Sequence, residues 1–231
     1  MTGVASSAPW PAVLLSLRVA AVATLAVAVA GTALAWVLVR RRFPGRGALG
    51  VAVMLPLVLP PTVTGYYLLA ALGRSGPVGR LLEAVLGRGV VFTWVAAAIA
   101  SAVVALPLMV GSARAAIEEV DPRLEHMAAL LGRSPWQVAW RVTLPLARRG
   151  IAAGVVLSFA RAFGEFGATL IVAGDIPGRT ETLPIAIYAA LQSGDDRGAL
   201  TLVALATLAG AAALAAVGRL AAPPHPRAPR R

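Results

Sequence analysis

The sequence predicts an all-α polytopic membrane protein with about five transmembrane helices, and two observations lead to that prediction. Hydrophobic residues make up 58% of the 231 residues and charged residues only 13%, about half the charged fraction of an average soluble domain. Several apolar runs also reach the roughly 20 residues that a helix needs to cross a bilayer. A soluble nucleic-acid-binding domain would explain the net charge of +11 but not these runs. We therefore expect contact with membrane lipid and no nucleic-acid partner.

The residue types that are missing exclude several kinds of chemistry. All 21 basic residues are Arg and the chain has no Cys. Without Lys there is no G-x-x-x-x-G-K-[ST] phosphate-binding loop, so the chain is not expected to be an ATPase. Without Cys there are neither disulfides nor thiolate metal sites. The two histidines, His126 and His225, make no metal cluster, and we expect this chain to bind no metal and no cofactor.

The first predicted span covers residues 13–39. Only Arg18 interrupts it, and we expect its side chain to snorkel to the interface beside Trp10. The span ends in the sequence RRRFPGRG at residues 40–47. An Arg cluster without nearby acids is typical of a cytoplasmic turn.

The second predicted span, residues 51–72, contains three prolines, Pro56, Pro60 and Pro61. Each proline lacks an N–H and leaves a carbonyl without its helical partner, which kinks the helix. In a membrane such backbone must face protein or a water-filled path. A Gly-rich connector at 73–89 follows.

After residue 89, the sequence predicts three further spans and one shorter apolar helix. The spans are expected at 90–112, 151–173 and 198–220, with a long polar interval at 113–150 between the first two. The segment 183–192 is apolar but about half the length needed to cross the hydrocarbon. We interpret it as an interfacial or re-entrant helix on the outer side.

The distribution of Arg predicts an outside N-terminus and a cytoplasmic C-terminus. Segments assigned to the inside contain 14 Arg and those assigned to the outside contain five, which agrees with the excess of positive charge in cytoplasmic loops. Residues 1–220 are predicted to form one transmembrane domain and 221–231 a disordered basic cytoplasmic tail. The inside segments are 40–50, 113–150 and the tail from Arg219; the outside segments are 1–12, 73–89 and 174–197.

The polar interval is predicted to begin with a short amphipathic helix. Asp121 and Pro122 suit an N-cap and a first helical position. Leu124, Ala128 and Leu131 then recur at i, i+4 and i+7 and form one helical stripe.

A second short helix is expected directly after the first. Gly132 ends the first helix, Ser134 and Pro135 begin the second, and Leu144 with Pro145 close it. From the pattern alone, the two helices either lie on the lipid surface or contact another protein.

The spacing within this interval resembles a known motif. Ala-x3-Gly-x9-Val-x-Leu-Pro is similar to the cytoplasmic EAA loop of ABC importer permeases, E-A-A-x3-G-x9-I-x-L-P, which in that family fits a groove of the ATPase subunit. His126 stands at the consensus Glu and Met127 at the first Ala, while Glu125 lies one place early. The resemblance implies a coupling loop within 113–150, with contact residues Glu125, His126, Met127, Ala128, Gly132, Val142, Leu144 and Pro145.

Two longer segments narrow the resemblance. PLVLPPTVTGYYLL at 56–69 and FARAFGEFGATLIVAGDIPGRTETLPIAIY at 159–188 resemble the molybdate-type permeases, to which tungstate and sulfate or thiosulfate permeases are close. The resemblance implies a homodimer in the bacterial plasma (inner) membrane that moves molybdate or a related oxyanion. It also implies two copies of an ABC ATPase subunit, which uses the ATP, and an extracytoplasmic molybdate-binding protein.

Arg161 and Glu165 are the only charged residues of the fourth predicted span. Their i, i+4 spacing places them on one helical face, and the cost of burying charge predicts that this face is turned to the bundle interior or a cavity. The pair either forms a structural salt bridge or contributes to an oxyanion path. Gly164 and Gly167 beside it permit close helix approach.

The second span offers further candidates for the same path. Freed backbone groups and hydroxyls after the proline break would line a polar route, or the Thr hydroxyls would repair the kink locally. The candidate path residues are Pro60, Pro61, Thr62, Thr64, Arg161, Glu165 and Thr169.

Two other classes of membrane protein are weighed against the permease. A membrane-embedded hydrolase would need a cluster of acids, a His or a nucleophile with its base inside the bilayer, and the sequence offers one Glu beside an Arg. A passive anion channel would use Arg161 but would have no reason to carry the EAA-like loop.

Overall fold

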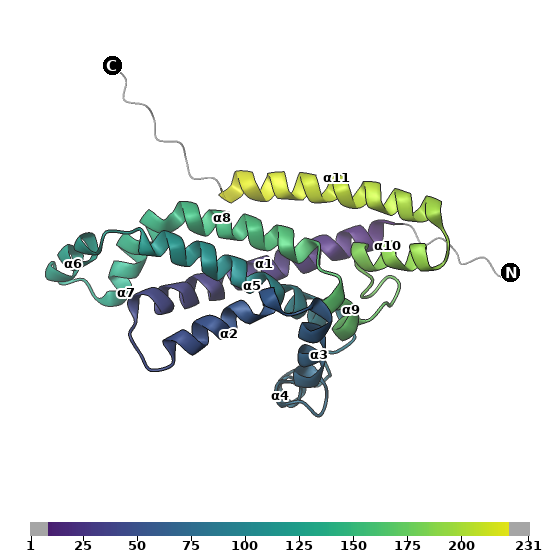
Figure 1. The fold of residues 1–231 in the computed structure, drawn as a ribbon, viewed down its shortest axis with the longest axis horizontal. Helices are drawn as coiled ribbons and strands as arrows, with labels where there is room; N and C mark the ends of the chain where they lie inside the picture. The colour runs from purple at the N-terminus through teal and green to yellow at the C-terminus, as the bar shows by residue number, and fades with distance from the viewer. Residues whose placement is uncertain (1–8, 222–231) are drawn as a thin grey trace, which may run out of the picture.

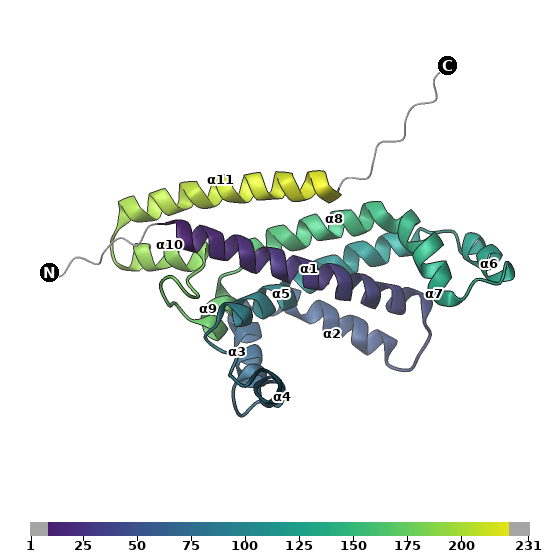
Figure 2. The same ribbon diagram turned by 180° about the vertical axis from the view of Figure 1, so that it is seen from behind.

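The computed structural model describes residues 9–221, and every regular element within that range is a helix. Five helices run roughly along the long axis of the molecule, and both views show them side by side (Figures 1 and 2). These are α1 (Trp10–Arg40), α2 (Arg46–Val58), α5 (Trp94–Glu118), α8 (Leu144–Phe163) and α11 (Asp196–Ala221).

The core lies between α1, α5 and α8, which make the most extensive helix contacts in the molecule. Met109 and Ile117 of α5 are fully buried there, surrounded by alanines such as Ala20 and Ala113. Small side chains let helix backbones approach closely, which is how apolar helices associate where no hydrophobic effect operates between them. α11 packs outside this core, against α8 and α10 (Leu183–Gln192).

Four helices are long and apolar enough to cross a membrane, or up to five if the bent pair α2 and α3 (Pro61–Leu72) counts as one span. The prediction of about five spans is therefore confirmed. The second predicted span is a broken one: α2 continues through Pro56, but the chain turns by 119° between α2 and α3. Pro60 and Pro61 lie at the turn, where neither can donate a backbone hydrogen bond.

The fourth predicted span, 151–173, is not continuous, and that expectation was wrong. α8 ends at Phe163 and a separate short helix, α9 (Gly167–Ala173), follows. The Glu165 carboxylate accepts a hydrogen bond from the Ala168 N–H at 2.8 Å. It thereby satisfies one of the backbone donors that the start of a new helix exposes.

The helix that contains the start of the fourth predicted span begins earlier than predicted. Leu144 and Pro145 do not end the helix before it, as had been expected. α7 (Pro135–Val138) passes through a π-helical turn (Ala139–Thr143) directly into α8, so that helix continues from Pro135 to Phe163. In a regular helix the Pro145 ring would clash with the carbonyl of Arg141. The wide turn lies directly before Pro145, where that clash would occur.

The two ends of the bundle are built differently (Figures 1 and 2). One end carries α6 (Pro122–Leu130) and α7, and the opposite end carries α9, α10 and the start of α1. α3 and α4 (Pro77–Leu86) project sideways from the bundle. α11 runs from the α10 end toward the α6 end, so its C-terminal end lies away from the start of α1 (Figures 1 and 2). Residues 1–8 of the predicted outside segment 1–12, and residues 222–231 of the predicted tail 221–231, lie outside the described range.

Arg18 does not lie beside Trp10 as expected. Its guanidinium stacks over the ring of Trp94, at the start of α5, 3.7 Å from the ring centroid. This cation–π contact keeps a charge within the α1 span next to an electron-rich partner.

Candidate functional site

Residues 121–143, which we call the knob, form α6, α7 and the π turn at one end of the bundle. Both helix starts were predicted correctly. The Asp121 side chain accepts from the Arg123 N–H at 2.9 Å. Ser134 and Gln137 form a reciprocal capping box, with bonds of 3.3 and 3.1 Å. These caps satisfy backbone donors that short helices otherwise leave open.

Gly132 separates the two knob helices, as predicted. Its φ of +80° lies in the left-handed region, which suits a residue without a Cβ. The following N–H, from Arg133, returns to the Ala128 carbonyl at 3.2 Å. Within residues 9–221 no other group lies within 4 Å of where a Cβ would be, so this part of the chain leaves the turn open.

The outer face of the knob is apolar and exposed. Leu130 and Leu131 are 87% and 82% exposed, and Leu124 and Met127 are also exposed. Trp136 and Trp140 continue this face, with their rings edge to face at 5.6 Å. Several large apolar side chains exposed on one short segment indicate an interaction surface. We call these six residues the knob face.

Glu125 points the other way, toward the bundle. Its carboxylate pairs with the Arg40 guanidinium at 3.0 Å, and both side chains are largely buried, with 19% and 16% exposure for Arg40 and Glu125. Arg40 also donates to the carbonyls of Ile117 and Val120, at 2.9 and 3.3 Å. One guanidinium thereby joins the end of α1, the end of α5 and the first knob helix.

A second donor completes this junction. The hydroxyl of Thr143, which is fully buried in the π turn, donates to the Glu125 carboxylate. Neither Arg40 nor Thr143 was predicted as a partner of Glu125, because residues 85 and 18 positions away leave no trace in local spacing. The sequence offered two signals for this junction: a carboxylate in the polar interval, Glu125, and an Arg at the end of the first span, Arg40.

The remaining coupling-loop candidates divide between the two sides of the knob. His126 and Met127 are exposed, as are Gly132 and Pro145, whereas Ala128, Val142 and Leu144 are half-buried. The His and Met that replace the consensus residues therefore face solvent in this chain, and Glu125 supplies the inward contact.

A second cluster forms where the two broken helices meet. A Cβ on Gly167, the first residue of α9, would lie 2.8 Å from the Pro61 Cβ. A Cβ on Gly65 would lie 3.1 Å from the Ala168 Cα. Gly167 therefore provides the close approach predicted for it, and α3 and α9 pack directly on one another. We call this region the paired breaks.

Arg161 and Glu165 form an ion pair at 2.7 Å beside the paired breaks, as their spacing predicted. Glu165 is 2% exposed, while the Arg161 side chain is 30% exposed. Thr169 is fully buried and donates to the Phe166 carbonyl at 2.8 Å. The Ala168 N–H and Arg161 thus satisfy the two oxygens of the Glu165 carboxylate, a backbone carbonyl accepts from Thr169, and Arg161 carries the accessible charge.

The candidates from the second span occupy different environments. Pro60, Pro61 and Thr62 are exposed, and Thr64 is buried. Among the described residues the Thr64 hydroxyl has no hydrogen-bond partner, so it does not repair the proline kink. A buried hydroxyl without a partner is costly, and here it lies one residue from the contact between α3 and α9.

Comparison with known proteins identifies the family. The family of binding-protein-dependent transport system inner membrane components matches residues 24–223. This chain belongs to that family. It is similar to the molybdenum transport system permease protein ModB of Escherichia coli, with 47% identity covering 84% of this chain and 85% of the relative. The putative molybdenum permease YvgM of Bacillus subtilis is 47% identical over 84% of this chain and 86% of the relative.

More distant relatives agree with the assignment. A probable sulfate transport system permease of Chlorokybus atmophyticus is 39% identical over 80% of this chain and 64% of its own length. Two solved structures share the fold: an inward-facing MetNI methionine ABC transporter (TM-score 0.65, 16% identity, covering 92% of this chain and 95% of that chain), and a bacterial alginate ABC transporter in complex with a periplasmic protein (TM-score 0.68, 21% identity, 91% and 76%). The chain is thus a multi-pass permease of the inner membrane.

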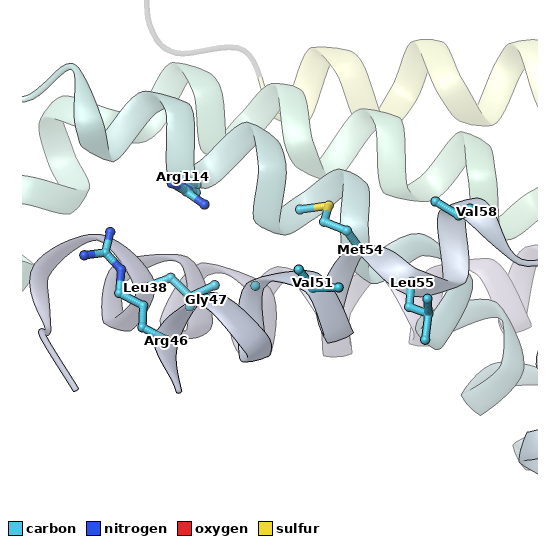
Figure 3. Close-up of a pocket in the computed structure, with 9 residues that line it drawn as sticks. Leu38, Arg46, Gly47, Val51, Met54, Leu55, Val58 and Arg114 are labelled. Atoms are coloured by element: carbon cyan, nitrogen blue, oxygen red, sulfur yellow. The ribbon is translucent and has the colours of Figure 1, made fainter. Parts of the chain in front are cut away.

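The permease has a groove of about 520 Å³ between α2 and α5 (Figure 3). Arg46 and Arg114 lie at one end, and Val51, Met54 and Val58 line the stretch that leads away from them (Figure 3). Apart from the two arginines, the residues that line the groove are glycines and apolar side chains.

Two carboxylates in the loop after α9 have a raised pKa. Burial raises the pKa of Asp175. Burial also raises the pKa of Glu181, and the nearby charge of Asp175 raises it further. Among residues 9–221 no group of three His, Asp or Glu side chains is placed to hold a metal ion.

Proposed function

We propose that this chain is the membrane-spanning permease subunit of an ABC importer that moves molybdate across the inner membrane. The observation that carries the proposal is the 47% identity to molybdenum permeases over 84% of the chain. A related oxyanion, tungstate or sulfate, is the alternative substrate, and the 39% identity to a sulfate permease is the observation that favours it.

The knob connects the permease to the ATPase subunit. This permease family works with separate ATPase subunits, and the knob face presents leucines and tryptophans to a partner. A protein groove is the better occupant than lipid, because the knob extends beyond the end of the helical bundle (Figure 1). When two ATPase subunits close on ATP, they pull the knobs, and rigid-body movement of packed helices switches the path between inward-facing and outward-facing states.

The junction at Glu125 turns a movement of the knob into a movement of the bundle. Arg40 links the knob to the ends of α1 and α5, and Thr143 links it to the start of α8. These are the three helices of the core. If the knob were attached only through exposed loop segments, those segments would deform when the ATPase subunits pulled the knob. The part-buried ion pair instead passes the movement to the core helices.

We propose the assembly that the family resemblance implies. The chain acts as a homodimer with two ATPase subunits at the knob end and an extracytoplasmic molybdate-binding protein at the opposite end. The excess of Arg in segments 40–50 and 113–150 supports a cytoplasmic knob. The N-terminus is then outside and the C-terminus cytoplasmic, and the ATP is bound by the partner rather than by this chain.

The paired breaks line the path that the oxyanion takes through the permease. Interrupted membrane helices are tolerated where they line a cavity or are buried in protein. Arg161 offers a positive charge to the oxyanion, and Glu165 limits how tightly that charge binds. Pro60, Pro61 and Thr62 are exposed beside it, and Thr64 and Thr169 lie within the packed contact.

Replacement of both Arg161 and Glu165 by Gln tests this path. A neutral pair keeps a hydrogen-bond acceptor for the Ala168 N–H, so the transporter still assembles. Uptake falls about ten-fold or more, the loss expected for one charge-assisted contact. Loss of the assembled complex would instead show that the pair is a structural bridge.

The substrate is tested by ATP-driven uptake into vesicles that contain permease, ATPase subunit and cognate binding protein. Radiolabelled molybdate is the cargo, and unlabelled tungstate and sulfate are the competitors. Molybdate uptake that requires ATP supports the proposal. Preferential uptake of sulfate would contradict the choice of substrate, and ATP-independent flux would favour a passive channel.

A further inference from the structure

A second cavity, of about 470 Å³, lies between the last turn of α1 and the inner side of the knob. It is separate from the knob face, which points outward, and from the paired breaks. The junction of Arg40 and Glu125 forms part of its lining. Nothing in the transport mechanism uses the rest of this cavity.

The cavity has a strong excess of positive charge. Arg41, Arg42 and Arg133 line it, together with His126. The acid among the lining residues is Glu125, and Arg40 already pairs with it. None of Arg41, Arg42 and Arg133 belongs to the ion pairs found among residues 9–221. All three residues are exposed, and a guanidinium group presents fork-shaped donors that match the oxygens of a phosphate.

The cavity is also lined by apolar residues. Trp36 and Val39 from α1 and Val138 and Ala139 from the knob line it. The Arg41 guanidinium lies over the Trp36 ring, 5.3 Å from the centroid. Because α1 is a membrane span, its last turn reaches the bilayer surface, where Trp commonly sits at the level of the headgroups.

We propose that this cavity binds the headgroup of an anionic phospholipid, with the phosphate between Arg41, Arg42 and Arg133 and the glycerol and first acyl carbons against Trp36 and Val39. The shared chemistry is a phosphate-type oxyanion, and the apolar wall decides between its two sources. A free ion would leave Trp36 and Val39 facing water, whereas a lipid covers them. Basic pockets between membrane helices and the surface recognise such headgroups in other membrane proteins.

The consequence is a contact between the bilayer and the junction that holds the knob. A lipid in the cavity lies beside Glu125 and Arg40 and links α1 to α6 on their open side. Anionic lipid is therefore expected to hold the knob in the position that the ATPase partner meets. The lipid site itself does not depend on which oxyanion is transported, because it requires only that α1 spans the membrane.

The test uses full-length permease, purified and reconstituted into nanodiscs of phosphatidylcholine doped with phosphatidylglycerol. Native mass spectrometry counts the phosphatidylglycerol that remains bound after release from the disc. The variant is Arg41→Gln with Arg42→Gln and Arg133→Gln. The matched control is Arg74→Gln with Arg80→Gln and Arg88→Gln, which removes the same charge from residues 74–88, away from the cavity.

The expected result is selective retention of phosphatidylglycerol over phosphatidylcholine by the wild type and the control. The cavity variant binds it roughly a hundred-fold more weakly, from about a factor of five for each Arg. Arg133→Gln alone, in an exposed turn, is expected to weaken binding about five-fold and covers the case in which the triple variant fails to fold.

Three outcomes would overturn the proposal. The first is equal retention by the wild type and the cavity variant. The second is displacement of the bound lipid signal by inorganic phosphate at matched concentration, which would indicate a free oxyanion. The third is measured on permease reconstituted together with its ATPase subunit: loss of that subunit from the cavity variant with lipid retention unchanged would show that the Arg cluster is a protein-docking surface.

Discussion

The knob and the paired breaks both contain a Glu–Arg ion pair, but they differ in which side chains they expose and which they bury. The knob directs its apolar side chains outward and keeps one carboxylate, Glu125, for a contact inside the chain. The paired breaks bury their polar groups and satisfy Glu165 and Thr169 with their own backbone. In both places a Glu–Arg ion pair lies where a helix begins or ends.

The difference implies that the knob is the part of the permease on which the ATPase subunits act, and that the paired breaks are the part that changes shape. At the knob, the ion pair joins elements that are distant in the sequence, so it makes a rigid connection. At the paired breaks, Arg161 and Glu165 are four residues apart, so the pair stabilises a local bend and leaves α3 and α9 joined mainly by close backbone contact. Substitutions at the two regions are therefore expected to act differently on coupling and on stability.

The largest effect is expected for Gly132→Asp. A bulky charge at the turn of the knob would misfit the ATPase groove, and we expect ATP-driven uptake to be abolished while membrane insertion is kept. The backbone cost of a side chain at positive φ is only about 1–2 kcal/mol. Gly87→Asp is the matched control, because Gly87 also has positive φ (+67°) and open space around a Cβ. Normal uptake by Gly132→Asp would refute the coupling role of the knob.

The next effect concerns the junction. Arg40→Gln and Glu125→Gln each leave a part-buried charge without its partner, so each should lower thermal stability and uncouple ATP hydrolysis from uptake. The double variant should lose less stability than the sum of the singles, with an interaction energy of about 1–3 kcal/mol. Unfolding temperatures in detergent measure this cycle. Strictly additive effects would mean that the ion pair carries no energy between α1 and the knob.

A smaller effect is expected at the contact of the paired breaks. Gly167→Ala would bring a methyl group to 2.8 Å from the Pro61 Cβ, and the overpacking should cost about 1–3 kcal/mol and slow transport. Gly218→Ala in α11 is the control, because no atom of the described chain lies within 4 Å of where its Cβ would be; it should be neutral or slightly stabilising. If both substitutions left unfolding temperature and uptake unchanged, the close contact would not matter.

The smallest effect is expected in the loop after α9. The raised pKa of Glu181 means that the folded permease holds its proton more tightly than the unfolded chain. Stability from this group is therefore present at low pH and is lost as pH rises through the folded pKa. Glu181→Gln should unfold at a slightly higher temperature than wild type at neutral pH and at the same temperature near pH 3. An advantage that grew toward low pH would reverse the assigned direction.

Local features of the knob were predictable because their causes are local. Asp121, Ser134 and Gly132 act on backbone groups within a few residues, and the structure confirms all three. The junction was not predictable in the same way. Its partners, Arg40 and Thr143, meet Glu125 only through the packing of α1, α6 and α8.

The paired breaks show the other limit of sequence reasoning. Prolines predicted the interruption between α2 and α3, because proline lacks a backbone N–H at any position. The break after Phe163 contains no proline, and its apolar surroundings were interpreted as one continuous span. Its signal was the sequence of Gly164, Glu165 and Gly167, where a buried carboxylate caps a new helix between residues that allow close approach.

Binding of the ATPase subunit to the knob face can be measured by cysteine labelling. The chain has no Cys, so Leu131→Cys introduces the only thiol, at a position that is 82% exposed. Leu81→Cys, 65% exposed on α4, is the control. Maleimide labelling of Leu131→Cys should slow at least about ten-fold when the ATPase subunit is bound, as expected for a thiol covered by an interface, while Leu81→Cys labels at the same rate. Equal labelling of Leu131→Cys with and without the ATPase subunit would contradict the account.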